Sequence, residues 1–202
     1  MSVKMAIIYY SATGTTYQLA RGIEEGAKSA GAEIRFLKVR ELAPEEAIAS
    51  NQGWADHRKE TQNVAEATLD DLTWADALIF GTPTRYGLPT AQLKQFIDTT
   101  GPLWGTGQLA NKITSSFCSA ATPHGGHETT IVALNNTFYH WGAIIVSPGY
   151  LDSVQFKSGN PYGVSFTSNN GALKPDETAL EAARFQGKRV AEVTAQFIAG
   201  RK

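Results

Sequence analysis

The sequence has little cysteine, no long apolar run and no excess of charge of one sign. Its one cysteine, Cys118, excludes an internal disulfide framework and fits a reducing compartment. Charges nearly balance, with 18 Lys and Arg against 19 Asp and Glu, and no basic cluster marks a nucleic-acid surface. No stretch approaches transmembrane length, and the first residues lack the regions of a signal peptide. We expect a cytoplasmic protein that binds neither nucleic acid nor membrane.

The most informative stretch is Ser11–Thr16, which contains no lysine. It follows the apolar run Met5–Tyr10 and opens a segment of helical periodicity. A triphosphate loop (G-x-x-x-x-G-K-[ST]) and a dinucleotide fingerprint (G-x-G-x-x-G) are both absent. Hydroxyls and the free N–H groups of a helix N-terminus would suit one terminal phosphate monoester. A hydroxyl-rich N-cap before an ordinary helix is the alternative. The stretch consists of Ser11, Ala12, Thr13, Gly14, Thr15 and Thr16.

Short apolar runs alternate with segments of helical periodicity along the chain, which predicts a parallel five-stranded sheet with helices on both faces. The first turn lacks the dinucleotide glycines, which favours the flavodoxin-like strand order 2-1-3-4-5, a three-layer sandwich with flavin mononucleotide (FMN) between the first and third strands. The length favours one domain, residues 1–202. The expected strands are Val3–Tyr10, Glu33–Val39, Ala77–Gly81, Lys112–Ser119 and Ala143–Val146, and the expected helices are Thr15–Ala30, Pro89–Thr99, His127–Trp141 and one starting at Pro175.

Other segments are less regular. Residues 40–71 form an excursion that is either a functional loop or oligomer contact, or a solvated surface segment, with a short helix near residues 70–74. Gly101–Gly105 and residues 147–173 are expected to be loops. In the first helix, we expect Ala30 on the buried face and Glu24 on the exposed face.

Two further loops follow predicted strands, Thr82–Gly87 and Ala120–Gly126. Ligand crevices of open α/β sheets lie at such carboxyl ends. The segment His124–Glu128, at the end of the second loop, lacks the H-E-x-x-H spacing, so we expect no metal site. Ser119 lacks a G-x-S-x-G elbow, which argues against a hydrolase.

Several short segments stand at the same distances from one another along the chain as in a known protein family, and together they extend over almost the whole chain. The sequence resembles the flavodoxin-like NAD(P)H:quinone oxidoreductases of the tryptophan-repressor-binding-protein (WrbA) type, and the Gly-Thr-Pro-Thr-Arg-Tyr-Gly loop is the most specific element. The segments are Tyr9–Ser11, Phe80–Gly87, Gly101–Trp104, Gly125–Glu128, Ser147–Tyr150, Pro161–Gly163 and Ala183–Gly187.

The resemblance implies roles for particular residues. Ser11–Thr16 would bind the FMN phosphate, and His140 would be a catalytic residue close to the flavin. Trp104 would form a wall of the substrate cavity, which the family's tetramers assemble across subunits. Thr13 stands where many relatives carry a tyrosine associated with nicotinamide-nucleotide binding, so it is a candidate substrate contact. Around the flavin ring the resemblance implies Pro83, Thr84, Arg85, Tyr86, Gly87, Ser119, Ala120, Ala121, Thr122, His124, Gly125 and His140.

The residues alone leave plainer interpretations open for three of these positions. Arg85 fits a surface salt bridge, Trp104 fits core or oligomer packing, and His140 fits a histidine favoured by a helix dipole.

The activity implied is FMN-dependent, two-electron reduction of quinones by NADH or NADPH, with ping-pong hydride transfer through flavin N5 in a homotetramer. The alternative is a flavodoxin-type electron carrier or binding module without substantial quinone turnover. Simple flavodoxins tend to be shorter and markedly acidic, whereas this chain has a net charge of −1. A third interpretation, binding to a repressor, is suggested only by the family's historical name.

Overall fold

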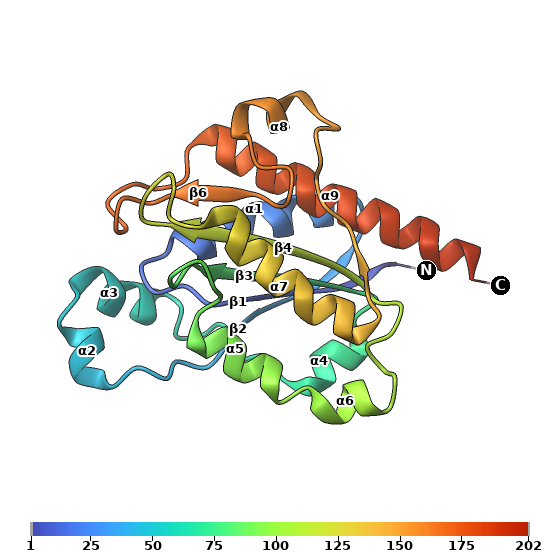
Figure 1. Cartoon of the computed structure of the whole chain (residues 1–202), viewed down its shortest axis with the longest axis horizontal. Helices are drawn as coiled ribbons and strands as arrows, with labels where there is room; N and C mark the ends of the chain where they lie inside the picture. The colour runs from blue at the N-terminus through green and yellow to red at the C-terminus, as the bar shows by residue number, and fades with distance from the viewer. Residues whose placement is uncertain (1, 202) are drawn as a thin grey trace.

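The computed structural model describes residues 2–201 and is built on a parallel sheet (Figure 1). The strand order is β2-β1-β3-β4-β5, so the predicted flavodoxin-like order is confirmed. A further short strand, β6, pairs with β4 outside this path. The strands are β1 (Lys4–Tyr9), β2 (Glu33–Lys38), β3 (Ala77–Pro83), β4 (Ile113–Ala120), β5 (Ile144–Ile145) and β6 (Ser165–Thr167).

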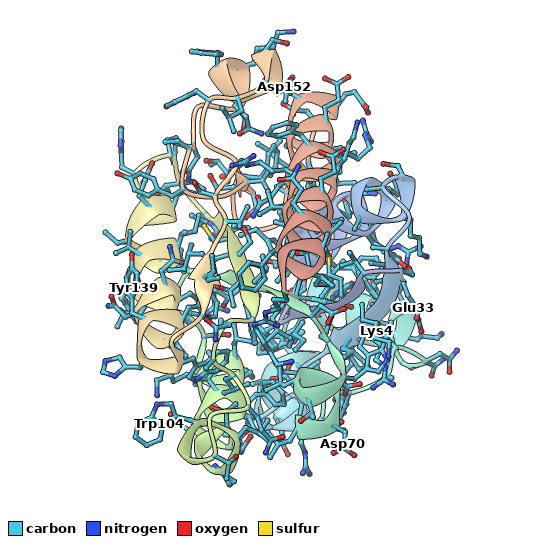
Figure 2. The ribbon with its side chains drawn as sticks, turned by 90° about the vertical axis from the view of Figure 1, so that its right-hand side faces the viewer. Lys4, Glu33, Asp70, Trp104, Tyr139 and Asp152 are labelled. Atoms are coloured by element: carbon cyan, nitrogen blue, oxygen red, sulfur yellow. The ribbon has the colours of Figure 1, made fainter. Side chains whose placement is uncertain are left out.

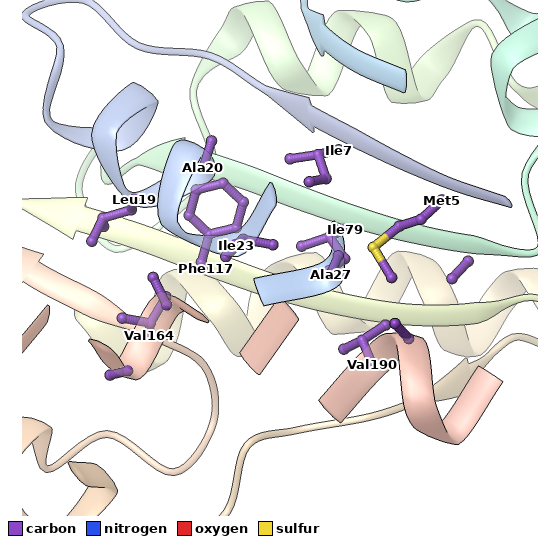
Figure 3. Packing of buried hydrophobic residues seen from close by; sticks show 14 of the residues in the cluster. Met5, Ile7, Leu19, Ala20, Ile23, Ala27, Ile79, Phe117, Val164 and Val190 are labelled. Atoms are coloured by element: carbon purple, nitrogen blue, oxygen red, sulfur yellow. The ribbon is translucent and has the colours of Figure 1, made fainter. Parts of the chain in front are cut away.

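Helices cover both faces of the sheet, as predicted. Along β1, Met5 and Ile7 pack with α1 and α9 in one core cluster, part of which Figure 3 shows. Ile8 packs on the opposite face, in a cluster with residues of α4, α5 and α7. The helices are α1 (Thr15–Ser29), α2 (Glu45–Ala49), α3 (Gln52–Glu60), α4 (Leu69–Trp74), α5 (Ala91–Asp98), α6 (Gly101–Gly105), α7 (His127–Trp141), α8 (Ser153–Ser158) and α9 (Glu177–Gly200).

Helices α1 and α9 pack in close contact because small residues lie where they cross. A Cβ atom on Gly26 would lie 1.8 Å from the carbonyl oxygen of Arg184, and one on Gly187 would lie 2.0 Å from that of Ile23. A side chain at either position would force the helices apart. This tight packing fixes α1, whose first turn belongs to the candidate site.

The fifth strand of the sheet differs from the prediction. Ala143–Val146 was expected to complete the sheet, but β5 spans Ile144–Ile145 and pairs with the start of β4. Strand β6 pairs with the end of β4 at Cys118–Ala120. The long strand β4 offers more backbone partners than β5 can fill, and Ser-Phe-Thr, a β-favouring segment of the expected loop, pairs with the rest.

Further expectations are also wrong, including the loop at residues 147–173, which contains α8 and β6. Residues 40–68 are not irregular, since they contain α2 and α3, and Gly101–Gly105 is the helix α6 rather than a loop. Glu24 is buried instead of exposed, because Arg21 and Lys28 on neighbouring turns neutralise its carboxylate. Ala30 is exposed, at the C-cap of α1. Within residues 2–201, no helix is long and apolar enough to cross a membrane.

Candidate active site at the carboxyl edge of the sheet

The turn between β1 and α1 gathers hydroxyls around the start of a 15-residue helix. Gly14 is the N-cap of α1, has a φ of 94° and provides no side-chain cap for the first turn. Its own N–H donates to Oγ of Ser11 at 3.1 Å, which closes the turn. The N–H groups of the first turn point out of the helix end beside Thr15 and Thr16. This arrangement of amides and hydroxyls fits a phosphate monoester.

A buried hydrogen bond joins this turn to the end of another strand. Oγ1 of Thr16 lies 2.9 Å from Oγ of Ser119, although 103 residues separate them in the chain. The carbonyl of Ser119 also accepts the N–H of Thr84 at 2.8 Å. Ser119 therefore connects the ends of β3 and β4 to the turn between β1 and α1.

The loop after β3 is a tight reverse turn. The N–H of Arg85 donates to the carbonyl of Leu88 at 2.8 Å, and the reverse bond is 3.0 Å. Tyr86 and Gly87 between them have φ values of 55° and 80°, as a type I′ turn requires. Oγ1 of Thr84 supports the turn by accepting from the Gly87 N–H at 3.1 Å and from the Thr130 hydroxyl at 2.8 Å.

These loops enclose a cavity of about 290 Å³. The predicted site residues that line it are Ser11, Ala12, Thr13, Thr15, Thr16, Pro83, Thr84, Arg85, Ser119, Ala120 and Ala121. The structure therefore brings together residues from three turns that were assigned separately. The cavity lies beside the ends of β1 and β3, where the strand order reverses.

Four lining residues were missed by the sequence analysis: Asn51, Trp54, Ser168 and Asn170. Asn51 and Trp54 belong to the excursion at residues 40–71, which was noted only as a possible functional loop. Ser168 and Asn170 belong to the Gly-, Ser- and Asn-rich stretch at residues 147–173. Both excursions fold back over the cavity, and local periodicity carries no signal for that.

Other predicted residues adjoin the cavity without lining it. Tyr86 projects fully into solvent from its turn, and neither Tyr86 nor Gly87 lines the cavity. Thr122 and His124 are exposed in the loop after β4, next to Gly125. Gly14 contributes to the turn between β1 and α1 through its backbone conformation.

His140 and Trp104 lie at the opposite edge of the sheet. The indole Nε1–H of Trp104 donates to the carbonyl of His140 at 2.8 Å, and both residues line a separate cavity of about 270 Å³. Figure 2 shows the Trp104 side chain on the outside of the fold. His140 lies in the last turn of α7, a helix of 15 residues that begins near the loop after β4 and is about 22 Å long. Within one chain, His140 is therefore remote from the first cavity.

A second histidine lies just behind the turn between β1 and α1. His57, on α3, is buried, and its Nδ1 would lie 3.4 Å from a Cβ atom on Gly14. Burial lowers the pKa of His57, although the carboxylate of Glu60 at 3.3 Å opposes that shift. His57 is therefore mainly neutral at neutral pH and packs against the Tyr17 ring, with 5.3 Å between ring centroids.

The cysteine and histidine at the start of α7 form a buried pair. Sγ of Cys118 lies 3.9 Å from Nδ1 of His127 and contacts its carbonyl oxygen at 3.3 Å, while Nε2 of His127 lies 3.1 Å from Oγ1 of Thr167. Burial raises the pKa of the Cys118 thiol, so the thiol stays protonated and unreactive. This pair joins α7 to β4 and β6 and does not reach the cavity.

Comparisons with known proteins agree with this architecture. Residues 3–157 match the family described as NADPH-dependent FMN reductase. A Deinococcus radiodurans protein named NAD(P)H dehydrogenase (quinone) is 47% identical over 197 residues, which cover 97% of this chain and 98% of that relative. A Sinorhizobium fredii protein of the same name is 43% identical over 200 residues, covering 96% and 98%.

Solved structures show the same fold. The flavodoxin, WrbA-like protein from Agrobacterium tumefaciens is 26% identical, with a TM-score of 0.67 and coverage of 96% of this chain and 99% of that one. A flavodoxin from the domain Archaea has a TM-score of 0.64 at 17% identity with the same coverage, and it supports the fold alone. The family match over residues 3–157 and the 47% identity to a full-length relative lead to one conclusion. The chain belongs to the NADPH-dependent FMN reductase family, as a flavin-binding protein of the WrbA type.

Proposed function

We propose that this protein is an FMN-dependent NAD(P)H:quinone oxidoreductase in which residues 1–202 form a single FMN-binding domain. The observation that carries the proposal is the cavity at the carboxyl edge, where the ends of β1, β3 and β4 meet. The relatives named NAD(P)H dehydrogenase (quinone) support both the reductant and the acceptor.

The residues of the cavity fit FMN. The first turn of α1 offers amides and hydroxyls to a phosphate, and Gly14 adopts a left-handed conformation that most side chains disfavour. In our proposal Ser11–Thr16 hold the phosphate, while Pro83–Arg85 and Ser119–Ala121 flank the ring. Tyr86, Gly87, Thr122, His124 and Gly125 would join this contact from the adjoining turns. When bound, FMN supplies hydride transfer through its N5 atom.

His140 and Trp104 fit the proposal only with a second copy of the chain. Trp104 is 57% exposed, and His140 beside it is also exposed. In a homotetramer, these residues of one subunit would face the flavin of another, where His140 could donate a proton to a forming quinol oxygen. We therefore propose a homotetramer in which Trp104 forms a wall of the quinone site.

The nicotinamide nucleotide would enter the same cavity. Thr13 lines it, and a Cβ atom on Gly171 would lie 2.8 Å from Oγ1 of Thr13, so the threonine is held between the turn and the later excursion. We propose Thr13 as a contact for NADH or NADPH. The single buried cysteine agrees with a cytoplasmic location for this chemistry.

Steady-state kinetics test the proposed function. Purified protein loaded with FMN should oxidise NADH or NADPH when benzoquinone is supplied, well above a blank of free FMN. Initial rates at several fixed quinone concentrations should give parallel double-reciprocal lines, as a shared site requires. Nucleotide oxidation no faster than the blank would reject the reductase and favour the electron carrier.

A further inference from the structure

The excursion that precedes α4 reaches the flavin cavity through Trp54. This residue lies on α3, is half-buried and lines the cavity together with Asn51. The Asn51 side chain caps α3 by accepting the N–H of Trp54 at 3.1 Å. A Cβ atom on Gly53 would lie 3.8 Å from Cγ2 of Thr13, so the start of α3 lies next to the phosphate-binding turn. The indole is thus part of the cavity wall.

The indole is held by a carboxylate that receives donors from several elements. Nε1–H of Trp54 donates to Oε2 of Glu41 at 3.1 Å, and the hydroxyl of Tyr10 donates to the same oxygen at 2.8 Å. Nε2 of Gln92, on α5, donates to Oε1 at 2.8 Å. The N–H groups of Leu42 and Ala43 complete the set at 2.9 and 3.0 Å. Glu41 therefore ties α3 to the end of β1 and to α5.

These donors keep the carboxylate charged. Burial by itself would raise the pKa of Glu41, but hydrogen bonds from Ala43, Gln92, Tyr10 and Trp54 outweigh it and hold the pKa below its usual range. Hydrogen bonds to an ionised acceptor are about twice as strong as neutral ones. Helices α2 and α3 have 5 and 9 residues, too few to be stable alone, so their placement depends on such tertiary contacts.

We propose that Trp54 is a flavin contact and that Glu41 is the positioning residue that fixes its indole as a wall of the cavity. This inference rests on the proposed FMN site and extends it to a segment that the sequence left unassigned. Glu41 acts through Trp54, and the carboxylate does not need to touch the flavin.

The first test compares FMN dissociation constants of two variants. Glu41→Gln keeps the shape of the side chain but replaces one accepting oxygen with an NH₂ group, which cannot accept the hydrogen bonds of the surrounding donors. The substitution should weaken FMN binding about tenfold. Glu45→Gln is the matched control, because Glu45 lies in the same excursion and accepts from Arg58 at 2.5 Å without contacting Trp54. The control should bind FMN as the unmodified protein does. Equal affinities for the two variants would overturn the role of Glu41.

The second test asks whether Glu41 acts through the indole. In a Trp54→Phe background, Glu41→Gln should weaken FMN binding less than in the unmodified protein, because the coupled partner is already lost. Strictly additive effects would contradict the positioning role.

The third test uses the emission of bound FMN, which an adjacent indole quenches by donating an electron. Trp54→Phe should increase the emission of the bound flavin, whereas Trp74→Phe should not. The Trp74 ring, on α4, instead stacks against Arg35, with 4.2 Å between its centroid and Cζ of the guanidinium. This comparison decides the contact even if Glu41→Gln does not fold, and equal emission from both variants would overturn it. If the unmodified protein does not bind FMN, the proposed function falls as well, whereas failure of the variant tests alone rejects only this inference.

Discussion

The two edges of the sheet carry proposed site residues of different kinds. At the carboxyl edge, the hydroxyls of Thr16, Thr84 and Ser119 are bonded to one another or to neighbouring loops of the same chain. At the amino edge, Trp104 and His140 are exposed, and the Trp104 indole donates to the backbone carbonyl of His140. One chain therefore builds the cavity at the carboxyl edge, whereas in our proposal Trp104 and His140 at the other edge act only against a second copy.

The largest expected effect comes from substituting His140. If the substitution had no effect on activity, the proposed catalytic role of the amino edge would be wrong. His140→Ala should lower the quinone-dependent turnover number about 100-fold, the usual scale for loss of a proton donor. The FMN dissociation constant of the same variant should change far less, because the turns that line each cavity come from a single chain and His140 lies about 22 Å along α7 from those of its own chain. Stopped-flow turnover and flavin titration measure the two quantities.

Dilution supplies the control for that prediction. If the proposed tetramer is correct, specific activity of the unmodified protein should fall as it dissociates, and mass photometry on the same samples would follow the dissociation. Full activity in a monomer would contradict a role for His140 in a neighbouring subunit.

An intermediate effect on FMN binding is expected from substituting a glycine at the carboxyl edge, Gly14, but not from substituting a matched glycine elsewhere, Gly107. Gly14 and Gly107 have φ values of 94° and 72°, so alanine at either position should cost about 1–2 kcal/mol of unfolding free energy. Gly14→Ala should also weaken FMN binding about tenfold, because a shift of this backbone misaligns the first-turn amides. Gly107 lies in the turn before β4 with nothing within 4 Å of its missing Cβ, so Gly107→Ala should leave FMN binding unchanged. Calorimetry and flavin titration check both, and equal FMN affinities would refute the proposed phosphate-binding role of the turn between β1 and α1.

The smallest effect concerns acid stability near the cavity. Burial lowers the pKa of His57 from its ordinary 6.5, so the unfolded chain binds this proton more readily than the folded one. The contribution of His57 is therefore present above pH 6.5 and declines as the pH falls through 6.5 toward the lowered folded value. His57→Gln should flatten this part of the stability profile in urea titrations, and an unchanged slope would show that another group carries it.

The sequence predicted the sheet better than the excursions. Strands β1 to β4 were located within a few residues: β1 and β3 from their nearly continuous apolar runs, as buried parallel strands have, and β2 from its alternating pattern. Glu24 was misassigned because its burial depends on two neighbouring cations. The segment around α3 was left open because its anchor, Glu41, bonds to Tyr10 and Gln92, which are 31 and 51 residues away.

By itself, the sequence determined the strand order, the hydroxyl-rich turn at Ser11–Thr16 and the family. Only the tertiary structure decided that Trp54, Ser168 and Asn170 join that turn in one cavity, and that Trp104 and His140 lie at the far edge. Local periodicity and capping depend on near neighbours, so they can be read along the chain. A cavity wall depends on contacts between residues far apart in sequence, and these form only when the sheet and its covering segments come together.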